Sequence, residues 1–136
     1  MAKSTDQGRA DALNVYFKAA SRSGSGNLYL GLYTNTSEPA AGATLASGLT
    51  ELPVTNGYAR IALADADWTI SGDLATNLQK TFTASGGDWG DVYGYFICDV
   101  ASGTSGNLLY VEQFGDGPYN VLDTQTVKVT PAVLAS

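Results

Sequence analysis

The alternation of side chains in NLYLGLYT, residues 27–34, is the feature that most constrains the fold. In an extended segment, successive side chains point to opposite faces. The leucines therefore share one face and the other residues share the opposite one: Leu28, Leu30 and Leu32 against Tyr29, Gly31 and Tyr33. This period of two predicts a strand with a buried row of leucines.

Further strand candidates alternate with turn residues along the rest of the chain. They are residues 57–64, 77–83, 91–98, 107–113 and 125–130. This spacing is typical of an antiparallel sandwich or barrel and not of β-α-β units. The loop at 35–56 is unusually long, and we interpret it as an arm that grips a neighbour. We therefore predict a mainly β fold, an antiparallel β-sandwich of jelly-roll-like topology with one N-terminal amphipathic helix.

The predicted helix occupies the first twenty residues. Ser4 followed by Gln7 fits a capping box, which places the start of the helix there. Apolar residues then recur at helical spacing and form one stripe: Ala10, Leu13, Tyr16, Phe17 and Ala20. SRSGSG, residues 21–26, ends the helix as a flexible joint. We divide the chain into the helix and joint at 1–26 and a β-sandwich domain at 27–136.

Charge is unevenly distributed between these two parts. Residues 1–22 carry four basic and two acidic side chains, a net +2, whereas the remainder carries three basic and eleven acidic ones, a net −8. One interpretation is a solvated helix face, or a helix packed on its own sheet. The other is an arm that docks on an acidic neighbour, such as a second copy of the chain. On the second interpretation the partner-binding residues are Arg9, Leu13, Tyr16, Phe17, Lys18 and Arg22.

Composition excludes several classes of function. The net charge of −6 disfavours nucleic acid as a partner, because affinity for phosphates comes largely from lysine and arginine. Histidine is absent, which removes the commonest general base and metal ligand, so we expect no enzymatic activity. The carboxylates at 65–67 and 88–91 match no calcium loop, and we expect no metal and no other cofactor. A single cysteine closes no intrachain disulfide.

The segment DWGDVYGYFICD, residues 88–99, predicts a strand covered on both faces. If the strand alternates regularly, Val92, Gly94, Phe96 and Cys98 share one face, and Tyr93, Tyr95, Ile97 and Asp99 share the other. Both sets are mostly apolar or aromatic, so either the fold covers both faces or a partner subunit meets the tyrosines. We predict that Cys98 is a buried small hydrophobe.

The aromatic residues of this region and its surroundings allow two interpretations. We assign Trp68, Trp89, Tyr93 and Tyr95 to the core or to an interface. The alternative is an exposed aromatic platform for sugars, as in a free-standing carbohydrate-binding module.

Several short motifs, taken in order, resemble a widespread family of small bacteriophage virion proteins commonly labelled tail fibre or decoration-type proteins. The N-terminal helix is followed by LYLGLYT (28–34), NGYAR (56–60), Asn77 and Phe82, DWGDVYGYFICD (88–99) and GNLLY (106–110). The resemblance covers most of residues 10–130. One departure is Leu122 in VLDTQT, where the family tends to have glycine before Asp-Thr.

The resemblance implies a non-enzymatic structural role in a virion. We expect a capsid decoration or cement protein that binds other virion proteins, such as the major capsid or tail proteins. The alternative is a tail or tail-fibre component with a receptor- or carbohydrate-binding face. We expect a homo-oligomer, with a trimer as one candidate. We expect the protein to be made soluble in the cytoplasm of the bacterial host, with no membrane partner, because no apolar run is long enough to cross a bilayer and no signal peptide is present.

Overall fold

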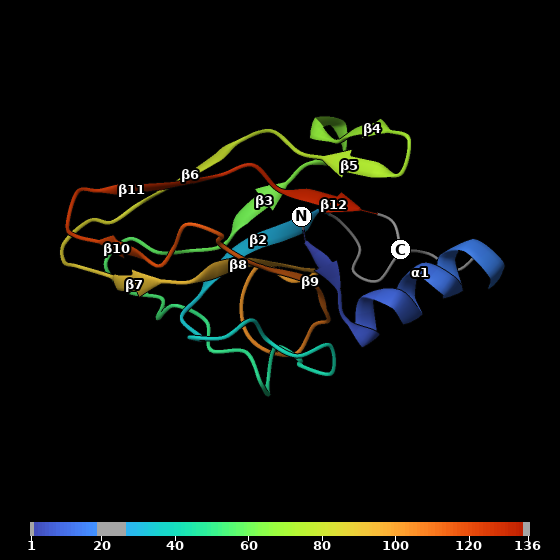
Figure 1. Ribbon diagram of the computed structural model, residues 1–136, viewed down its shortest axis with the longest axis horizontal. Coiled ribbons are helices and arrows are strands. Elements are labelled where there is room, and N and C mark those ends of the chain that lie inside the picture. The colour runs from blue at the N-terminus through green and yellow to red at the C-terminus, as the bar shows by residue number, and fades with distance from the viewer. Residues whose placement is uncertain (1, 19–26, 135–136) are drawn as a thin grey trace.

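The protein is an antiparallel β structure with one helix at its N-terminal end (Figure 1). The structure is a computed structural model that describes residues 2–18 and 27–134. The elements, in chain order, are β1 (Lys3–Ser4), α1 (Asp6–Lys18), β2 (Leu28–Tyr33), β3 (Ile61–Leu63), a 3-10 turn at Asp65–Asp67, β4 (Thr69–Ser71), β5 (Leu74–Thr76), β6 (Lys80–Thr83), β7 (Gly90–Val92), β8 (Gly94–Cys98), β9 (Leu108–Gln113), β10 (Tyr119–Val121), β11 (Thr126–Val129) and β12 (Ala132–Leu134).

A five-stranded sheet forms one layer, with strand order β1-β9-β8-β2-β3. Two shorter ladders form the opposite layer, β11 with β6 and β12 with β5 and β4, whereas the ladder of β10 with β7 continues from the end of β8 (Figure 1). Each of these strand ladders is antiparallel. The prediction of a mainly β, antiparallel, sandwich-like fold with one helix is confirmed.

The leucine row of β2 faces the core between the two layers. Leu30 and Leu32 are fully buried there together with Ile97 of β8. Phe82 of β6 and Val127 of β11 close the same core from the opposite layer. The face assignment made from the alternation in β2 is therefore confirmed.

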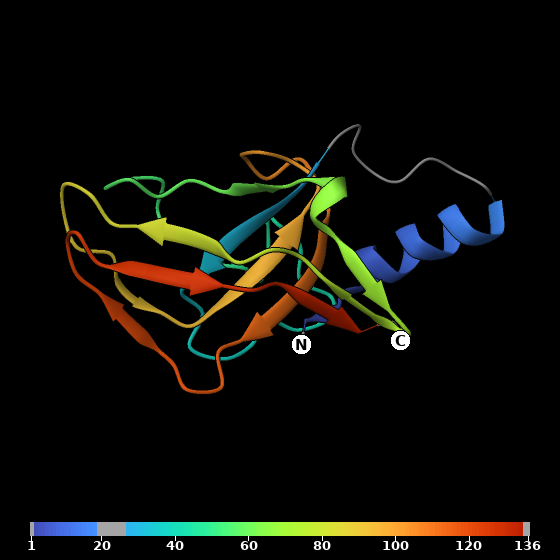
Figure 2. The ribbon, with the colours of Figure 1, turned by 90° about the horizontal axis from the view of Figure 1, so that it is seen from above.

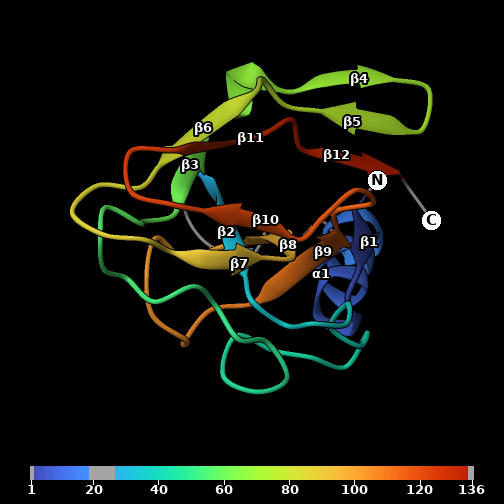
Figure 3. The ribbon, with the colours of Figure 1, turned by 60° about the vertical axis from the view of Figure 1, so that its left-hand side comes forward.

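The second face of the five-stranded sheet is covered by the long loop at 35–56. Ala43 and Leu45 of this loop are buried against Phe96 and Cys98 of β8. The loop lies on the side of the sheet away from β6 and β11, as Figure 3 shows. A loop that packs in this way completes the core of its own chain, which is a different role from the neighbour-gripping arm expected from its length.

The strand predicted at 91–98 is two strands in two different sheets. β7 pairs with β10, whereas β8 lies between β2 and β9. Between them, the Tyr93 N–H donates to the Tyr33 carbonyl at 3.1 Å, and the Tyr93 carbonyl accepts the Phe114 N–H at 2.9 Å. The break shifts the alternation by one residue, so Val92 joins the inter-layer core while Phe96 and Cys98 face the loop. The predicted common face for Val92 and Cys98 is therefore wrong.

Five strands lie outside the predicted segments: β1, β4, β5, β10 and β12. Each contains only two or three residues, which is too short to show a period of two. Their extended form depends on neighbours that are distant in sequence. β12, for example, pairs with β5, and Ala2 bridges Val133 beside it.

Candidate partner-binding surface

The first turn of α1 is built into the body of the protein. Thr5, which is fully buried, accepts the Gly8 N–H at 3.1 Å and donates its own hydroxyl to the Leu108 carbonyl. Thr5 therefore caps the helix, and the expected cap at Ser4 is displaced by one residue. The Gln7 side chain does not close a capping box but accepts the Leu108 N–H at 2.9 Å. The start of α1 is thus fastened to β9 by the side chains of Thr5 and Gln7.

Gly8 lets the helix approach β9 closely. A Cβ at this position would lie 2.3 Å from the Leu109 carbonyl oxygen, closer than any real contact. Only glycine allows the backbones of α1 and β9 to come this near. This explains why a residue that weakens isolated helices stands in the first turn.

Beyond Gly8, α1 presents exposed side chains. Leu13 is 57% exposed and Val15 is 37% exposed, while Ala10 and Ala12 are also exposed. The helix extends beyond the edge of the sheets at one end of the molecule (Figure 2). Its start is therefore packed on its own sheet, whereas the described apolar residues of its later turns remain uncovered.

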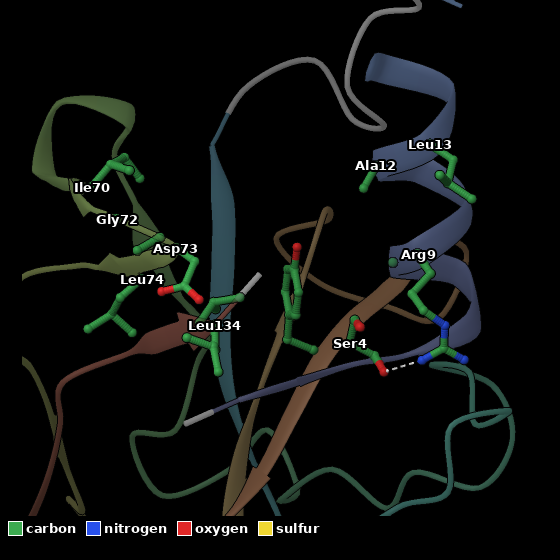
Figure 4. A pocket seen from close by; sticks show the side chains of 13 residues that line it. Ser4, Arg9, Ala12, Leu13, Ile70, Gly72, Asp73, Leu74 and Leu134 are labelled. Atoms are coloured by element: carbon green, nitrogen blue, oxygen red, sulfur yellow. Dashed lines mark hydrogen bonds between the residues drawn. The ribbon is translucent and has the colours of Figure 1, made fainter. Parts of the chain in front are cut away.

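An apolar groove lies between α1 and the hairpin formed by β4 and β5 (Figure 4). Its volume is about 510 Å³, which is within the range of ligand-binding clefts. The helix wall, the hairpin wall and the floor comprise Ser4, Gly8, Arg9, Ala12, Leu13, Ile70, Gly72, Asp73, Leu74, Ala75, Tyr110, Val133 and Leu134. We call this feature the helix–hairpin groove.

A second groove, of about 580 Å³, also borders β1. It shares Ser4, Arg9 and Leu134 with the helix–hairpin groove and reaches Pro39 in the long loop. An ion pair between Lys3 and Glu38, at 3.3 Å, lies on its wall. Arg9 therefore lies where the two grooves meet. Its guanidinium donates to the Ser4 carbonyl at 3.0 Å and to the Asp6 carboxylate.

The predicted partner-binding residues are only partly described. Arg9 and Leu13 are exposed and line the helix–hairpin groove. The side chains of Tyr16, Phe17 and Lys18, and the whole of Arg22, lie outside the described residues. The assignment of these residues to partner binding stays a prediction.

The two tryptophans pack against the inter-layer core. Trp68 and Trp89 are half-buried, and both contact that core. The indole N–H of Trp89 donates to the Asn56 carbonyl at 2.8 Å, and its ring meets Tyr58 edge-on with centroids 5.9 Å apart. Trp89 is therefore held by contacts within its own chain.

The tyrosines of the central strand region are also engaged. Tyr95 is 4% exposed and donates to Glu112 at 2.6 Å, and burial followed by this hydrogen bond raises its pKa. Tyr93 is half-buried against the core beneath the long loop. Since Tyr95 is buried and the other three aromatics are packed on a core, these four residues do not form an exposed sugar platform.

A buried polar cluster around Arg60 was not predicted as a site. The guanidinium makes two hydrogen bonds to Glu51, at 2.9 and 2.7 Å, and Glu51 also accepts the Tyr58 hydroxyl at 2.6 Å. Arg60 also donates to the carbonyls of Val100 and Gly103, at 3.0 and 2.9 Å. The signal for this cluster was the motif NGYAR, which the family resemblance had already singled out. The cluster joins two loops to the sheet and is structural.

The described residues offer little reactive chemistry. Cys98 is fully buried, as predicted, and burial raises the pKa of its thiol, which keeps it protonated at neutral pH. Within residues 2–18 and 27–134, no three histidine, cysteine or acidic side chains come together in a way that could hold a metal ion. The helix in this part of the chain is too short and too polar to span a bilayer.

Comparison with known proteins gives one family. The chain matches the family described as "Podophage GP4 fiber I protein gp80" over residues 3–134, which includes both walls of the helix–hairpin groove. No curated protein matches the chain.

Proposed function

Since the chain belongs to the podophage GP4 fiber I protein gp80 family and is thus a bacteriophage virion structural component, we propose that it is a subunit of a fibre attached to the phage tail. The match along residues 3–134 is the observation that carries this proposal. It favours the fibre location over capsid decoration, which was the first location expected from the sequence. The role is non-enzymatic: the protein acts by binding other virion proteins and further copies of itself.

The shape of the molecule supports a role in assembly. α1 lies at one end of the long axis, and the turn between β10 and β11 lies at the other (Figure 1). The end with α1 carries the grooves and exposed apolar residues, among them Leu13. An elongated subunit with an adhesive end is suited to attachment by that end.

Antibody labelling of intact particles, viewed by cryo-electron microscopy, tests the location. Label on fibres at the tail is the expected result. Label distributed over the capsid shell would overturn the fibre assignment in favour of decoration. A protein missing from purified particles would overturn both locations.

A further inference from the structure

We propose that the helix–hairpin groove joins two copies of this chain about a two-fold axis. In this contact the α1 wall of each copy lies against the β4–β5 wall of the other. The proposal rests on the self-association included in the proposed function, but it does not depend on where the protein sits in the virion. It yields a dimer, in place of the trimer considered from the sequence.

The first support is the concentration of exposed apolar side chains. Seven large apolar residues are exposed in the part of the chain that the structure describes, and three of them line this groove: Leu13, Ile70 and Leu134. Ile70 is 69% exposed although it lies in a strand. Single exposed apolar residues are common, but three around one cleft indicate a surface that another molecule covers.

The second support is the exposure of β4. This strand ends the order β12-β5-β4, and Thr69, Ile70 and Ser71 are all exposed. A strand of three residues is too short to pair strongly with another strand, so a neighbouring copy would contact β4 through these side chains. None of them is charged, so the hairpin wall is open to the apolar side chains of a partner helix.

Charge identifies a second copy as the occupant. Among the described lining residues only two are charged, Arg9 on the helix wall and Asp73 at the hairpin turn. A two-fold contact is reciprocal: if a residue of one copy contacts a different residue of the partner, the same pair also forms with the roles of the copies exchanged. When the α1 wall of each copy meets the β4–β5 wall of the other, Arg9 of each copy therefore lies near Asp73 of the partner. Leu13 of each copy likewise lies near Ile70 of the partner. A guanidinium has five N–H donors, so Arg9 can keep its bonds to Ser4 and Asp6 and still bind that carboxylate.

Sedimentation equilibrium of the purified protein tests whether the groove supports association. We expect a dimer that Ile70→Asp weakens at least about tenfold, because a charge is then placed at the centre of the contact. Val54→Asp is the control: Val54 is 70% exposed and lies outside the groove, so this change adds the same charge away from the contact. Both variants should melt at similar temperatures.

Disulfide trapping between two different variants tests the geometry. Leu13→Cys and Ile70→Cys proteins are mixed and mildly oxidised, while the native Cys98 stays buried. We expect the mixture to yield a covalent dimer that contains one of each variant, and each variant alone to yield much less. This result specifically requires the α1 wall of one copy to meet the hairpin wall of the other.

Three outcomes would overturn the proposal. A wild-type protein that stays monomeric at about 100 μM would show that the groove does not join two copies, since a specific contact of this kind is normally populated at that concentration. A dimer weakened equally by Val54→Asp, or one that gives no mixed disulfide, would place the contact elsewhere. None of these outcomes bears on the virion location, which the labelling experiment decides separately.

Discussion

At the scale of single residues, the motifs that resemble virion proteins are explained by one connected cluster. Tyr58 accepts the Leu32 N–H at 3.0 Å and stacks on Phe82 with ring centroids 6.0 Å apart. Trp89 completes the cluster with an edge-on contact to the Tyr58 ring. Residues from three separate motifs thus meet around one tyrosine, which indicates that these motifs maintain the fold and do not form a ligand site.

Removing the Arg60 guanidinium should destabilise the protein strongly. The Arg60 side chain is 3% exposed, and its loss leaves the half-buried Glu51 carboxylate without its cation and two loop carbonyls without their donor. For Arg60→Met we expect a fall of about 3 kcal/mol in the free energy of unfolding, measured by urea denaturation. Lys128→Met, an exposed change on β11, should alter it by less than about 0.5 kcal/mol. Equal effects of the two changes would contradict this view of the cluster.

Alkaline pH should also destabilise the protein. Burial is the main cause that raises the pKa values of Tyr33, Tyr58 and Tyr95 above their ordinary 10.0, and nearby glutamates raise them further. Because the folded state holds these protons more tightly than the unfolded state, the associated stability is complete below pH 10 and is lost as the pH rises above it. Each tyrosine can lower the free energy of unfolding by up to about 1.4 kcal/mol for each pH unit above 10.

Urea titrations at pH values from 9 to 12 measure this slope. Tyr58→Phe removes one of the three groups, so the free energy of unfolding of this variant should fall less steeply with pH than that of the wild type. Parallel curves for the two proteins would show that Tyr58 ionises equally easily in the folded and unfolded states.

At the scale of elements, α1 combines two roles along its length. Its first turn is fastened to β9 through Thr5, Gln7 and Gly8, and its later residues carry the exposed wall of the helix–hairpin groove. Isolated helices of this length are marginal in water, so the contact with β9 is what positions the exposed wall.

Gly8→Ala tests how closely α1 must approach β9. Although alanine favours helices, its Cβ would overlap the Leu109 carbonyl, so we expect a loss of about 1–3 kcal/mol in the free energy of unfolding. Gly42→Ala is the matched control, because the nearest atom to its added Cβ would be an Asp6 oxygen at an ordinary 3.7 Å. If Gly8→Ala were neutral or stabilising, the helix could be displaced from β9 without cost.

At the scale of the whole molecule, the described residues form two apolar cores. One core fills the space between the sheet layers, and the other lies beneath the long loop. Together they bury both faces of β8, whose five residues are all buried.

A chelator should therefore leave the protein unchanged. We expect EDTA not to alter the melting temperature measured by circular dichroism, because the cores are sufficient for a domain of this size. A fall of more than about 5 °C would show that an ion contributes roughly 1 kcal/mol or more to stability.

The sequence by itself determined the elements whose pattern is local. The alternation in β2 identified its buried face, and the apolar character of residues 91–98 predicted a strand covered on both faces, which holds for β8. The spacing of strand candidates and turn residues favoured an antiparallel β fold. These features could be predicted because the period of two and the burial of both faces are recorded in consecutive residues.

Only the tertiary structure decided how the surfaces are assembled. The helix–hairpin groove joins residues near 10, 70, 110 and 134, and its hairpin wall consists of strands too short to show a pattern. The break at Tyr93 likewise depends on hydrogen bonds to β2 and to Phe114, which are distant in sequence. Such features depend on contacts between residues that are distant in sequence. These contacts leave no periodic pattern in consecutive residues, so the sequence by itself could not reveal them.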